Sequence, residues 1–299
     1  MLNYNSNSIT SLEGDHIHQL QKNILKKIIL PRPLESHKGN FGHILTIGGN
    51  ENYGGAIIMS SSAAVHGGAG LVSCATDSKN LTALHSIVPE AMFINYNNDV
   101  DLINAVKKAD VIVIGPGLGE NTAALKILKK VVLNTVEKQF IIVDGSAITL
   151  ISDQQNLKTI LANRKTIYTP HQMEWQRLSG IKIAEQSVSK NILKQHELAG
   201  TVVLKKYHTT IYHTNTPPSQ LKIGGPYMST GGMGDTLTGI IAAFLGQFHY
   251  KNYEQIVDAA VYTHSAISQK LSSSRYVVLP MDIIGELQNF MYKYASQAR

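Results

Sequence analysis

Cysteine is almost absent from this sequence, whose 299 residues include one, Cys74. A single thiol excludes a framework of intrachain disulfides, and the histidines do not supply zinc-ligand spacing in its place. Cys74 lies in the apolar run 70–75, which is typical of a buried, unreactive thiol. This cysteine usage fits a reducing compartment, and we expect a cytoplasmic protein.

Long apolar runs are also missing. No stretch approaches the roughly 18 apolar residues that cross a bilayer, and residues 1–21 are polar, without the apolar core of a signal peptide. No linker rich in proline or serine and no block of like charge divides the chain. We therefore expect one domain over residues 1–299, with no membrane association.

Clustered arginine is a third absence. The formal net charge of +6 and the pI near 9.2 favour anionic ligands. The lysines are scattered, however, and no arginine-rich stripe with interleaved aromatic residues occurs, so nucleic acid is not an expected partner. Phosphorylated small molecules account for the sign of the charge equally well.

Short apolar runs alternate with helical patterns along most of the chain. Continuous apolar runs predict buried parallel strands at 43–47, 71–75, 111–114, 140–143, 166–168 and 202–204. Apolar residues at three- and four-residue spacing predict helices at 55–66, 122–133, 174–178, 234–248 and 253–271. Residues 201–205 and 209–213 predict an antiparallel edge. The alternation indicates an α/β fold, with a mostly parallel central sheet and helices on both faces.

Polar and glycine-rich segments follow four of the predicted strands. They are Gly-Gly-Asn at 48–50, Gly-Pro-Gly-Leu-Gly at 115–119, Asp-Gly-Ser at 144–146 and Thr-Pro-His at 169–171. Ligands of open parallel sheets bind beyond the carboxyl ends of the strands. We expect these four segments to converge on one crevice.

The most informative segment is 231–239, which places Gly-Gly-Met-Gly-Asp at the start of a predicted helix. Glycines let backbone N–H groups converge, and the helix dipole adds positive charge, so Gly232 and Gly234 are expected to contribute to an anion hole for a transferring phosphoryl group. Asp235 would then serve as a general base that takes a proton from an attacking hydroxyl. The structural alternative is an ordinary glycine-rich loop with Asp235 as a helix-start acid.

Familiar nucleotide motifs do not fit. Gly49 and Gly54 have P-loop spacing, but Gly-Ala follows where Lys and Ser or Thr are required. The 115–119 segment lacks the spacing of a Rossmann fingerprint, and no G-x-S-x-G elbow occurs. The Asp-His-Ile-His run at 15–18 stands in a polar segment without zinc spacing.

Several strand-end side chains are secondary candidates. His171 and Glu174 begin a helix and are expected to face the crevice, although a surface histidine and a helix-start acid are simpler interpretations. Asp144 could orient a magnesium-bound water or the substrate, or merely cap the next turn. Lys205, Lys206 and Thr209 could hold a nucleotide or form a solvated hairpin tip.

Taken in chain order, these motifs resemble the ADP/ATP-dependent NAD(P)H-hydrate dehydratases, a branch of the ribokinase-like fold. The resemblance covers nearly the whole chain. It rests on the segments at 37–42 (His-Lys-Gly-Asn-Phe-Gly), 47–49, 53–56, 66–72, 115–119, 169–171 and 231–239. Sugar and vitamin kinases of this fold share the last segment but often carry Asn after Thr-Pro, where this chain has His171.

The resemblance implies site residues position by position. Ala56, Gly117, His171 and Asp235 match residues that hold the hydrated nicotinamide nucleotide. The adenine-nucleotide contacts match a second set, which comprises Lys205, Lys206, Tyr207, His208, Thr209 and Gly234. Glu174 is expected to hold Mg²⁺ through water.

The chain departs from the family pattern at three positions. Lys206 stands where the family usually has Gly, Met233 replaces the Thr of Gly-Thr-Gly-Asp, and Gly145 replaces the Ala of Asp-Ala. Met233 keeps its backbone donor, so catalysis should survive. The effects of Lys206 on nucleotide affinity and of Gly145 on the turn stay open.

The implied activity is removal of water from the S epimer of hydrated NADH or NADPH, coupled to hydrolysis of ADP or ATP with Mg²⁺. The resemblance also implies a homo-oligomer, often a tetramer, and a separate epimerase that interconverts the two hydrate epimers. Two alternatives stay open: a ribokinase-like kinase of a sugar or vitamin-precursor alcohol, and a nucleotide-binding protein without turnover.

Overall fold

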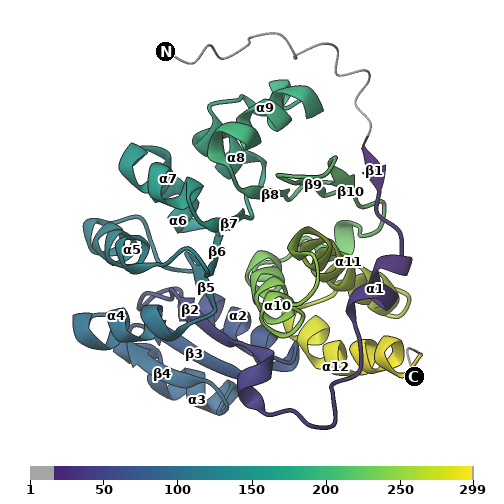
Figure 1. Cartoon of the computed structure of the whole chain (residues 1–299), viewed down its shortest axis with the longest axis horizontal. Coiled ribbons are helices and arrows are strands. Elements are labelled where there is room, and N and C mark those ends of the chain that lie inside the picture. The colour runs from purple at the N-terminus through teal and green to yellow at the C-terminus, as the bar shows by residue number, and fades with distance from the viewer. Residues whose placement is uncertain (1–16, 298–299) are drawn as a thin grey trace, which may run out of the picture.

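The computed structural model describes residues 17–297 and consists of a central sheet between two layers of helices (Figure 1). Residues 1–16 of the polar N-terminal segment, including Asp15 and His16, lie outside this description. The strands are β1 His18–Gln19, β2 His43–Ile47, β3 Leu71–Thr76, β4 Met92–Asn95, β5 Val111–Ile114, β6 Phe140–Val143, β7 Lys165–Tyr168, β8 Thr201–Leu204, β9 Thr210–Tyr212 and β10 Ser219–Gln220.

The strands join in the order β1-β10-β9-β8-β7-β6-β5-β2-β3-β4. All pairs from β4 to β8 are parallel, and β9 pairs antiparallel with both β8 and β10. β1 adds in parallel to β10. The mostly parallel sheet with an antiparallel edge is therefore confirmed.

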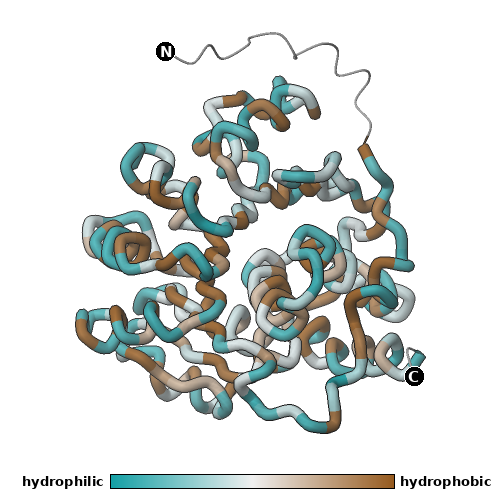
Figure 2. Tube along the Cα trace, in the orientation of Figure 1, coloured by the Kyte–Doolittle hydropathy of each residue, from teal (hydrophilic) through white to brown (hydrophobic). Residues whose placement is uncertain are grey.

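Helices cover both faces of the sheet, and each face buries its own hydrophobic core (Figures 1 and 2). One layer comprises α1 Asn23–Ile28, α2 Gly54–His66, α3 Leu81–Ile87, α10 Met233–Gln247, α11 Tyr253–Ser272 and α12 Pro280–Ser296. The other comprises α4 Asp99–Lys108, α5 Thr122–Asn134, α6 Ser146–Ser152, α7 Gln155–Ala162, α8 Gln172–Ser179 and α9 Val188–Leu198. Short 3₁₀ turns lie at Lys38–Phe41, Ser78–Asn80, Ile183–Glu185 and Pro226–Met228. No described helix combines the length and apolarity that a membrane crossing needs.

The predicted strands at 43–47, 111–114 and 140–143 match β2, β5 and β6 to the residue. The apolar pattern missed β4, an edge strand whose Met92 is exposed, and the two-residue strands β1 and β10. It also missed helices α1, α3, α4, α6, α7, α9 and α12, which lie outside the predicted ranges. The helix predicted at 174–178 begins earlier, at Gln172.

The direction of strand addition reverses between β2 and β5, because β3 and β4 extend one side of the sheet and β6 to β8 the other. Such a switch point opens a crevice at the carboxyl ends of the strands. Two glycine-rich segments meet there: Gly49 N donates to Pro116 O at 2.8 Å, and Asn50 N donates to Gly117 O at 2.7 Å. Two of the four strand-end segments therefore lie in contact.

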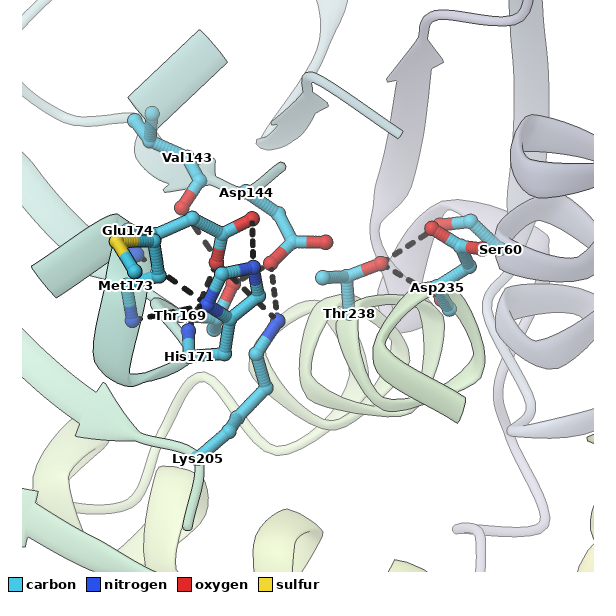
Figure 3. Close-up of polar contacts among 10 residues, drawn as sticks. All are labelled: Ser60, Val143, Asp144, Thr169, His171, Met173, Glu174, Lys205, Asp235 and Thr238. Atoms are coloured by element: carbon cyan, nitrogen blue, oxygen red, sulfur yellow. Dashed lines mark hydrogen bonds and ion pairs between the residues drawn. The ribbon is translucent and has the colours of Figure 1, made fainter. Parts of the chain in front are cut away.

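Helix α10 crosses this region in close contact with α2. A Cβ at Gly239 would lie 2.1 Å from Ser60 O, so the two backbones approach at a distance that only glycine permits. Beside this contact, Ser60 Oγ and Thr238 Oγ1 are 3.0 Å apart and share a hydrogen bond (Figure 3). The packing fixes α10, and with it the position of the helix N-terminus.

Candidate active site

No side chain caps the N-terminus of α10. Gly232 is the N-cap, in the left-handed region at φ +91°, and no side chain caps the helix. The first hydrogen bond within the helix runs from Thr236 N to Gly232 O. By contrast, Asn98, Asn121 and Asn252 cap α4, α5 and α11 through their side chains. The first-turn N–H groups of α10 therefore remain available to an anion.

The surroundings of Gly232 also favour glycine at this position. A Cβ there would come within 2.5 Å of Met59 Cε and 2.9 Å of Pro280 Cγ. The next residue, Met233, is buried, so its side chain belongs to the core while its N–H belongs to the first turn of α10. The Met233 departure from the family pattern thus leaves the backbone donor in place.

Asp235 is the acidic residue of this first turn and is only partly exposed. Burial, followed by the negative charge of Asp144, raises the pKa of Asp235 to about 7, and Lys205 opposes the shift. A carboxyl with this pKa is half ionised near neutral pH. It has the protonation behaviour that a general base needs.

Lys205 brings a positive charge to the carboxylates of Asp144 and Glu174, near the start of α10 (Figure 3). Its Nζ lies 2.7 Å from Asp144 Oδ1 and 4.0 Å from Glu174 Oε2. A Cβ at Gly234 would lie 3.0 Å from this nitrogen, so the ammonium contacts the open end of α10. Burial lowers the pKa of Lys205, but Asp144 and Glu174 outweigh it, so the net pKa is raised and the side chain stays charged.

Backbone pairing places Lys205 there. It follows β8 and forms a parallel bridge with His171, and its N–H donates to Pro170 O at 2.8 Å. Asp144 follows β6 and is held by Thr169, whose hydroxyl donates to Asp144 Oδ1 at 2.7 Å. Three strand ends therefore meet around one ammonium group.

His171 and Glu174 form a capping box at the start of α8. His171 Nδ1 accepts from the N–H groups of Met173 and Glu174, and Glu174 Oε2 accepts from His171 N at 2.7 Å. The His171 ring is half exposed, whereas Glu174 is buried. Burial raises the pKa of Glu174, and Lys205 opposes that effect. Both residues thus have a structural role whatever they bind.

A cavity of about 670 Å³ opens beside this cluster. Its lining includes every residue predicted to contact the nucleotide: Lys205, Lys206, Tyr207, His208, Thr209 and Gly234. Tyr207 is largely exposed and stacks on His208, with ring centroids 4.0 Å apart. Burial lowers the pKa of Lys206, whose side chain takes part in the lining. The predicted nucleotide segment therefore surrounds a cavity of ligand size.

Ala56 and Gly117 do not line this cavity. They lie together, because a Cβ at Gly117 would be 3.0 Å from Ala56 Cβ and 2.3 Å from Tyr53 O. Gly117 has φ +62°, which suits glycine. The same segment reaches the charged cluster, since a Cβ at Gly115 would be 1.8 Å from Asp144 O. The segment that carries Gly117 thus reaches the backbone of Asp144 from the side of β5, through Gly115.

Sequence reasoning missed part of the cavity wall. Residues 223–226, 228 and 229 follow the antiparallel edge, and Val261, His264 and Ser265 come from α11. None belongs to a recognisable motif. Asp144, a secondary candidate from the sequence, is central to the charged cluster because it contacts Lys205. Gly145, which follows it, has φ +52° and lets the chain turn into α6.

The cluster does not form a metal cage by itself. Among residues 17–297, no group of three or more His, Cys, Asp or Glu side chains is arranged to hold a metal ion. Asp144 Oδ1 is already bound by Lys205 and Thr169, and Glu174 Oε2 by His171 N. Mg²⁺ commonly keeps several waters and uses one or two carboxylates plus substrate phosphates. The donors fit an ion that arrives with a nucleotide, held through water.

Comparison with known proteins gives a consistent result. The family model described as NAD(P)H-hydrate dehydratase matches residues 44–289. A protein of Enterococcus faecalis named ADP-dependent (S)-NAD(P)H-hydrate dehydratase is 48% identical over 276 residues, which are 92% of this chain and 93% of that protein. A Lactiplantibacillus plantarum protein of the same name is 46% identical, over 92% of this chain and 97% of its own.

A solved structure, that of a ribokinase-like superfamily protein from Enterococcus faecalis, superposes with a TM-score of 0.90 at 47% identity. The match covers 96% of this chain and 99% of that one. The ribokinase-like architecture expected from the sequence is thereby confirmed.

Proposed function

This chain belongs to the NAD(P)H-hydrate dehydratase family, and we propose that Asp235, at the open N-terminus of α10, is the general base of its reaction. The enzyme dehydrates the S epimer of hydrated NADH or NADPH to NADH or NADPH, with hydrolysis of ADP or ATP. Because the relatives at 46–48% identity are named ADP-dependent, we propose ADP as the preferred donor.

The observation that carries the assignment of Asp235 is its position. It lies in the first turn of α10, with a pKa of about 7, beside first-turn N–H groups that no side chain caps. A carboxylate close to an anion site suits removal of a proton from a hydroxyl that attacks phosphorus.

The reaction then follows from the chemistry of the hydrate, whose hydroxyl is on the carbon next to the ring nitrogen. Asp235 takes the proton of this hydroxyl as its oxygen bonds to the terminal phosphorus of the nucleotide, and the bond to the AMP or ADP leaving group breaks. The N–H groups of Met233, Gly234 and Asp235 and the ammonium of Lys205 stabilise the developing charge. The ring nitrogen lone pair next expels phosphate, and loss of a proton from the adjacent carbon restores the double bond.

We propose that Mg²⁺ enters with the nucleotide, held through water by Glu174 and Asp144. Its chemistry there would be neutralisation of phosphate charge. Lys205, which Asp144 holds over Gly234, supplies positive charge from the protein itself.

We further assign the hydrate to Ala56, Gly117 and His171, and the nucleotide to the cavity lined by Lys205, Lys206, Tyr207, His208 and Thr209. His171 also lines this cavity, so we place it between the two ligands. The segment that carries Gly117 reaches Asp144 from β5 through Gly115, and the nucleotide cavity adjoins the charged cluster from β8. The two substrates would therefore meet at Asp235, which is where the phosphoryl group must pass.

We also propose a cytoplasmic homo-oligomer, a tetramer as in the family pattern, that works beside a separate epimerase. Exposed apolar side chains at Tyr276, Leu279 and Met281, near the start of α12, support an interface there. Light scattering after size-exclusion chromatography tests the assembly, and a monomer would contradict it.

The decisive experiment mixes the protein with NADH hydrate, Mg²⁺ and either ADP or ATP, and follows the near-ultraviolet absorbance of the dihydronicotinamide ring. Recovery of this band only with nucleotide, and its loss in Asp235→Asn, is the expected result. If Asp235→Asn keeps more than about a tenth of the wild-type kcat while folded, the general-base role is wrong. A phosphorylated product accumulating one-for-one with nucleotide consumed would instead indicate a kinase.

A further inference from the structure

A serine hydroxyl in the wall of the nucleotide cavity has no hydrogen-bond partner in the protein. Ser265, in α11, is 7% exposed and lines the cavity. Among the residues that the structure describes, no group bonds to its hydroxyl. Ser62 Oγ is also unpaired but is enclosed by protein, whereas Ser265 Oγ is open to the cavity. A ligand in the cavity can therefore reach this hydroxyl.

The direction of the Ser265 hydroxyl sets it apart from a serine one turn further along α11. Serine hydroxyls in helices commonly bond to a carbonyl of the preceding turn, as Ser268 does by donating to His264 O at 2.9 Å. Ser265 makes no such bond. Its Oγ lies toward Gly224, another residue of the cavity wall, where an added Cβ would be 3.9 Å away. The hydroxyl thus points out of the helix and toward the cavity.

The wall of the cavity has a charged part and an apolar part. The segment after β8 contributes the ammonium groups of Lys205 and Lys206. The loop after β10 and the helices α10 and α11 contribute apolar side chains, which are Ile223, Met228, Met233, Leu237 and Val261. Phosphates need positive charge, whereas the faces of a purine base suit apolar surroundings. The two parts of the wall therefore match the two ends of an adenine nucleotide.

Ser265 belongs to the apolar part. The Cβ position of Gly224 that lies 3.9 Å from Ser265 Oγ is also 3.3 Å from Met228 Sδ, and Val261 precedes Ser265 by four residues on the same helix face. The adjacent His264 offers no alternative contact, because its unpaired Nε2 is enclosed by protein. A hydroxyl both donates and accepts hydrogen bonds, and the edge of adenine carries ring nitrogens that accept and an amino group that donates.

We propose that Ser265 Oγ hydrogen-bonds to the edge of the adenine base, whose ring lies against Met228 and Val261, and that Ser265 is therefore a specificity-determining residue for the nucleotide. This inference rests on the proposed function, since it takes the cavity as the nucleotide site. It assigns to α11 a recognition role that the sequence motifs do not include.

Isothermal titration calorimetry on the full-length protein tests the proposal with ADP and four analogues, each changed at one position of the base edge. They are 1-deaza-ADP, 3-deaza-ADP, 7-deaza-ADP and purine riboside 5′-diphosphate, which lacks the amino group. Wild-type protein should bind one of them about fivefold more weakly than ADP, the loss expected for one neutral hydrogen bond. Ser265→Ala should bind ADP about fivefold more weakly and bind that analogue as well as it binds ADP. Ser265→Thr, which keeps a hydroxyl, should retain the discrimination.

Ser268→Ala is the matched control. Ser268 is buried in the same helix, its hydroxyl bonds to backbone, and it does not line the cavity. This variant should discriminate among the analogues as the wild type does, because it removes a hydroxyl from α11 without changing the cavity wall.

Equal affinity of the wild type for ADP and all four analogues would overturn the proposal, as would discrimination that persists unchanged in Ser265→Ala. Titrations with 2′-deoxy-ADP and 3′-deoxy-ADP add a further check. If Ser265→Ala abolishes discrimination against one of these instead, the hydroxyl contacts the ribose and the proposal is wrong. The proposed function fails differently: NADH hydrate would not be converted with any nucleotide although the base discrimination is present.

Discussion

Lys205 Nζ and Asp144 Oδ1 lie 2.7 Å apart, although 61 positions separate the residues in the chain. Asp144 is 3% exposed, and its contact directs the ammonium toward Gly234 at the open end of α10. The carboxylate thus positions a cation where a phosphoryl group would gain negative charge. Lys205 is also close enough to lower the pKa of Asp235. One side chain therefore acts on both the phosphoryl group that is attacked and the proposed base.

Replacing Lys205 by Met should lower kcat by about 100-fold, through loss of charge stabilisation in the transition state. It should also raise the apparent pKa of Asp235, because the opposing positive charge is removed. Steady-state rates across a pH series test both effects. Lys206→Met is the matched control: this neighbouring lysine lines the nucleotide cavity, so it should weaken nucleotide binding but leave the inflection of the pH profile in place. An unmoved inflection in Lys205→Met would contradict the electrostatic role.

The pH dependence of kcat/KM should follow ionisation of Asp235. The base form predominates above its pKa of about 7, so kcat/KM should increase about tenfold per pH unit below this value and level off above it. Asp235→Asn should remove the dependence along with most of the activity. A profile that is flat between pH 5 and 7 would argue against Asp235 as the base.

Stability should show the opposite dependence on pH. Burial raises the pKa of Asp235 from 3.8 to about 7, so between these values the folded state binds more protons than the unfolded state. Stability then decreases as pH rises through this window. Asp235→Asn removes this pH-dependent contribution to stability. The Tm of the variant should therefore rise relative to that of the wild type from pH 4 to pH 7, and the difference should stay constant above pH 7. Asp153→Asn, which removes an exposed carboxylate, is the control variant in the same thermal melts.

His171 offers a way to separate structure from binding. His171→Ala removes the N-cap of α8 and should lower the free energy of unfolding by about 1 kcal/mol, whereas His171→Asn keeps a capping side chain and should stay near the wild type. Both variants should raise KM for the hydrate if the half-exposed ring contacts it. Denaturant melts measure the stability of both variants, and initial rates measure KM. A normal KM in His171→Asn would show that His171 only caps α8 and does not contact the hydrate.

Gly232→Ala tests the open helix end. The change forces a Cβ against the end of the Met59 side chain and puts a side chain on backbone at φ +91°. Even if Met59 shifts, this backbone strain should displace the first turn of α10. We expect a loss of kcat of about 100-fold, the scale of a missing oxyanion donor. Gly231→Ala is the control, because a Cβ there meets nothing within 4 Å. Equal activities of the two variants would contradict the proposed anion site.

The central strands were predictable because β5 and β6 are continuous apolar runs, buried on both faces. The glycine-rich start of α10 was predictable for a related reason, since few other structures need that pattern. Four strand ends could be placed on one edge of the sheet from chain order alone.

The partnership of Lys205 with Asp144 could not be predicted in the same way. It depends on the bridge between Lys205 and His171, which sets how far Lys205 extends beyond β8. The place of His264 in the cavity wall could not be predicted either, because the sequence of α11 is that of an ordinary buried helix. Only packing brings this residue to the cavity. Two-residue strands such as β1 and β10 carry too few residues to establish a period.

The pairing of β1 with β10 has a consequence for how the chain is made. His18 aligns with Ser219, about 200 residues later, so a ribosome that extends the chain by roughly 5–20 residues per second delivers the second strand at least about ten seconds after the first. The first strand must therefore wait, unpaired, while the rest of the sheet is synthesised. When β10 is made, β1 pairs with it and closes the edge of the sheet beside the nucleotide segment. Ribosome-bound chains that end before β10 should therefore be cleaved readily by protease at residues 18–22.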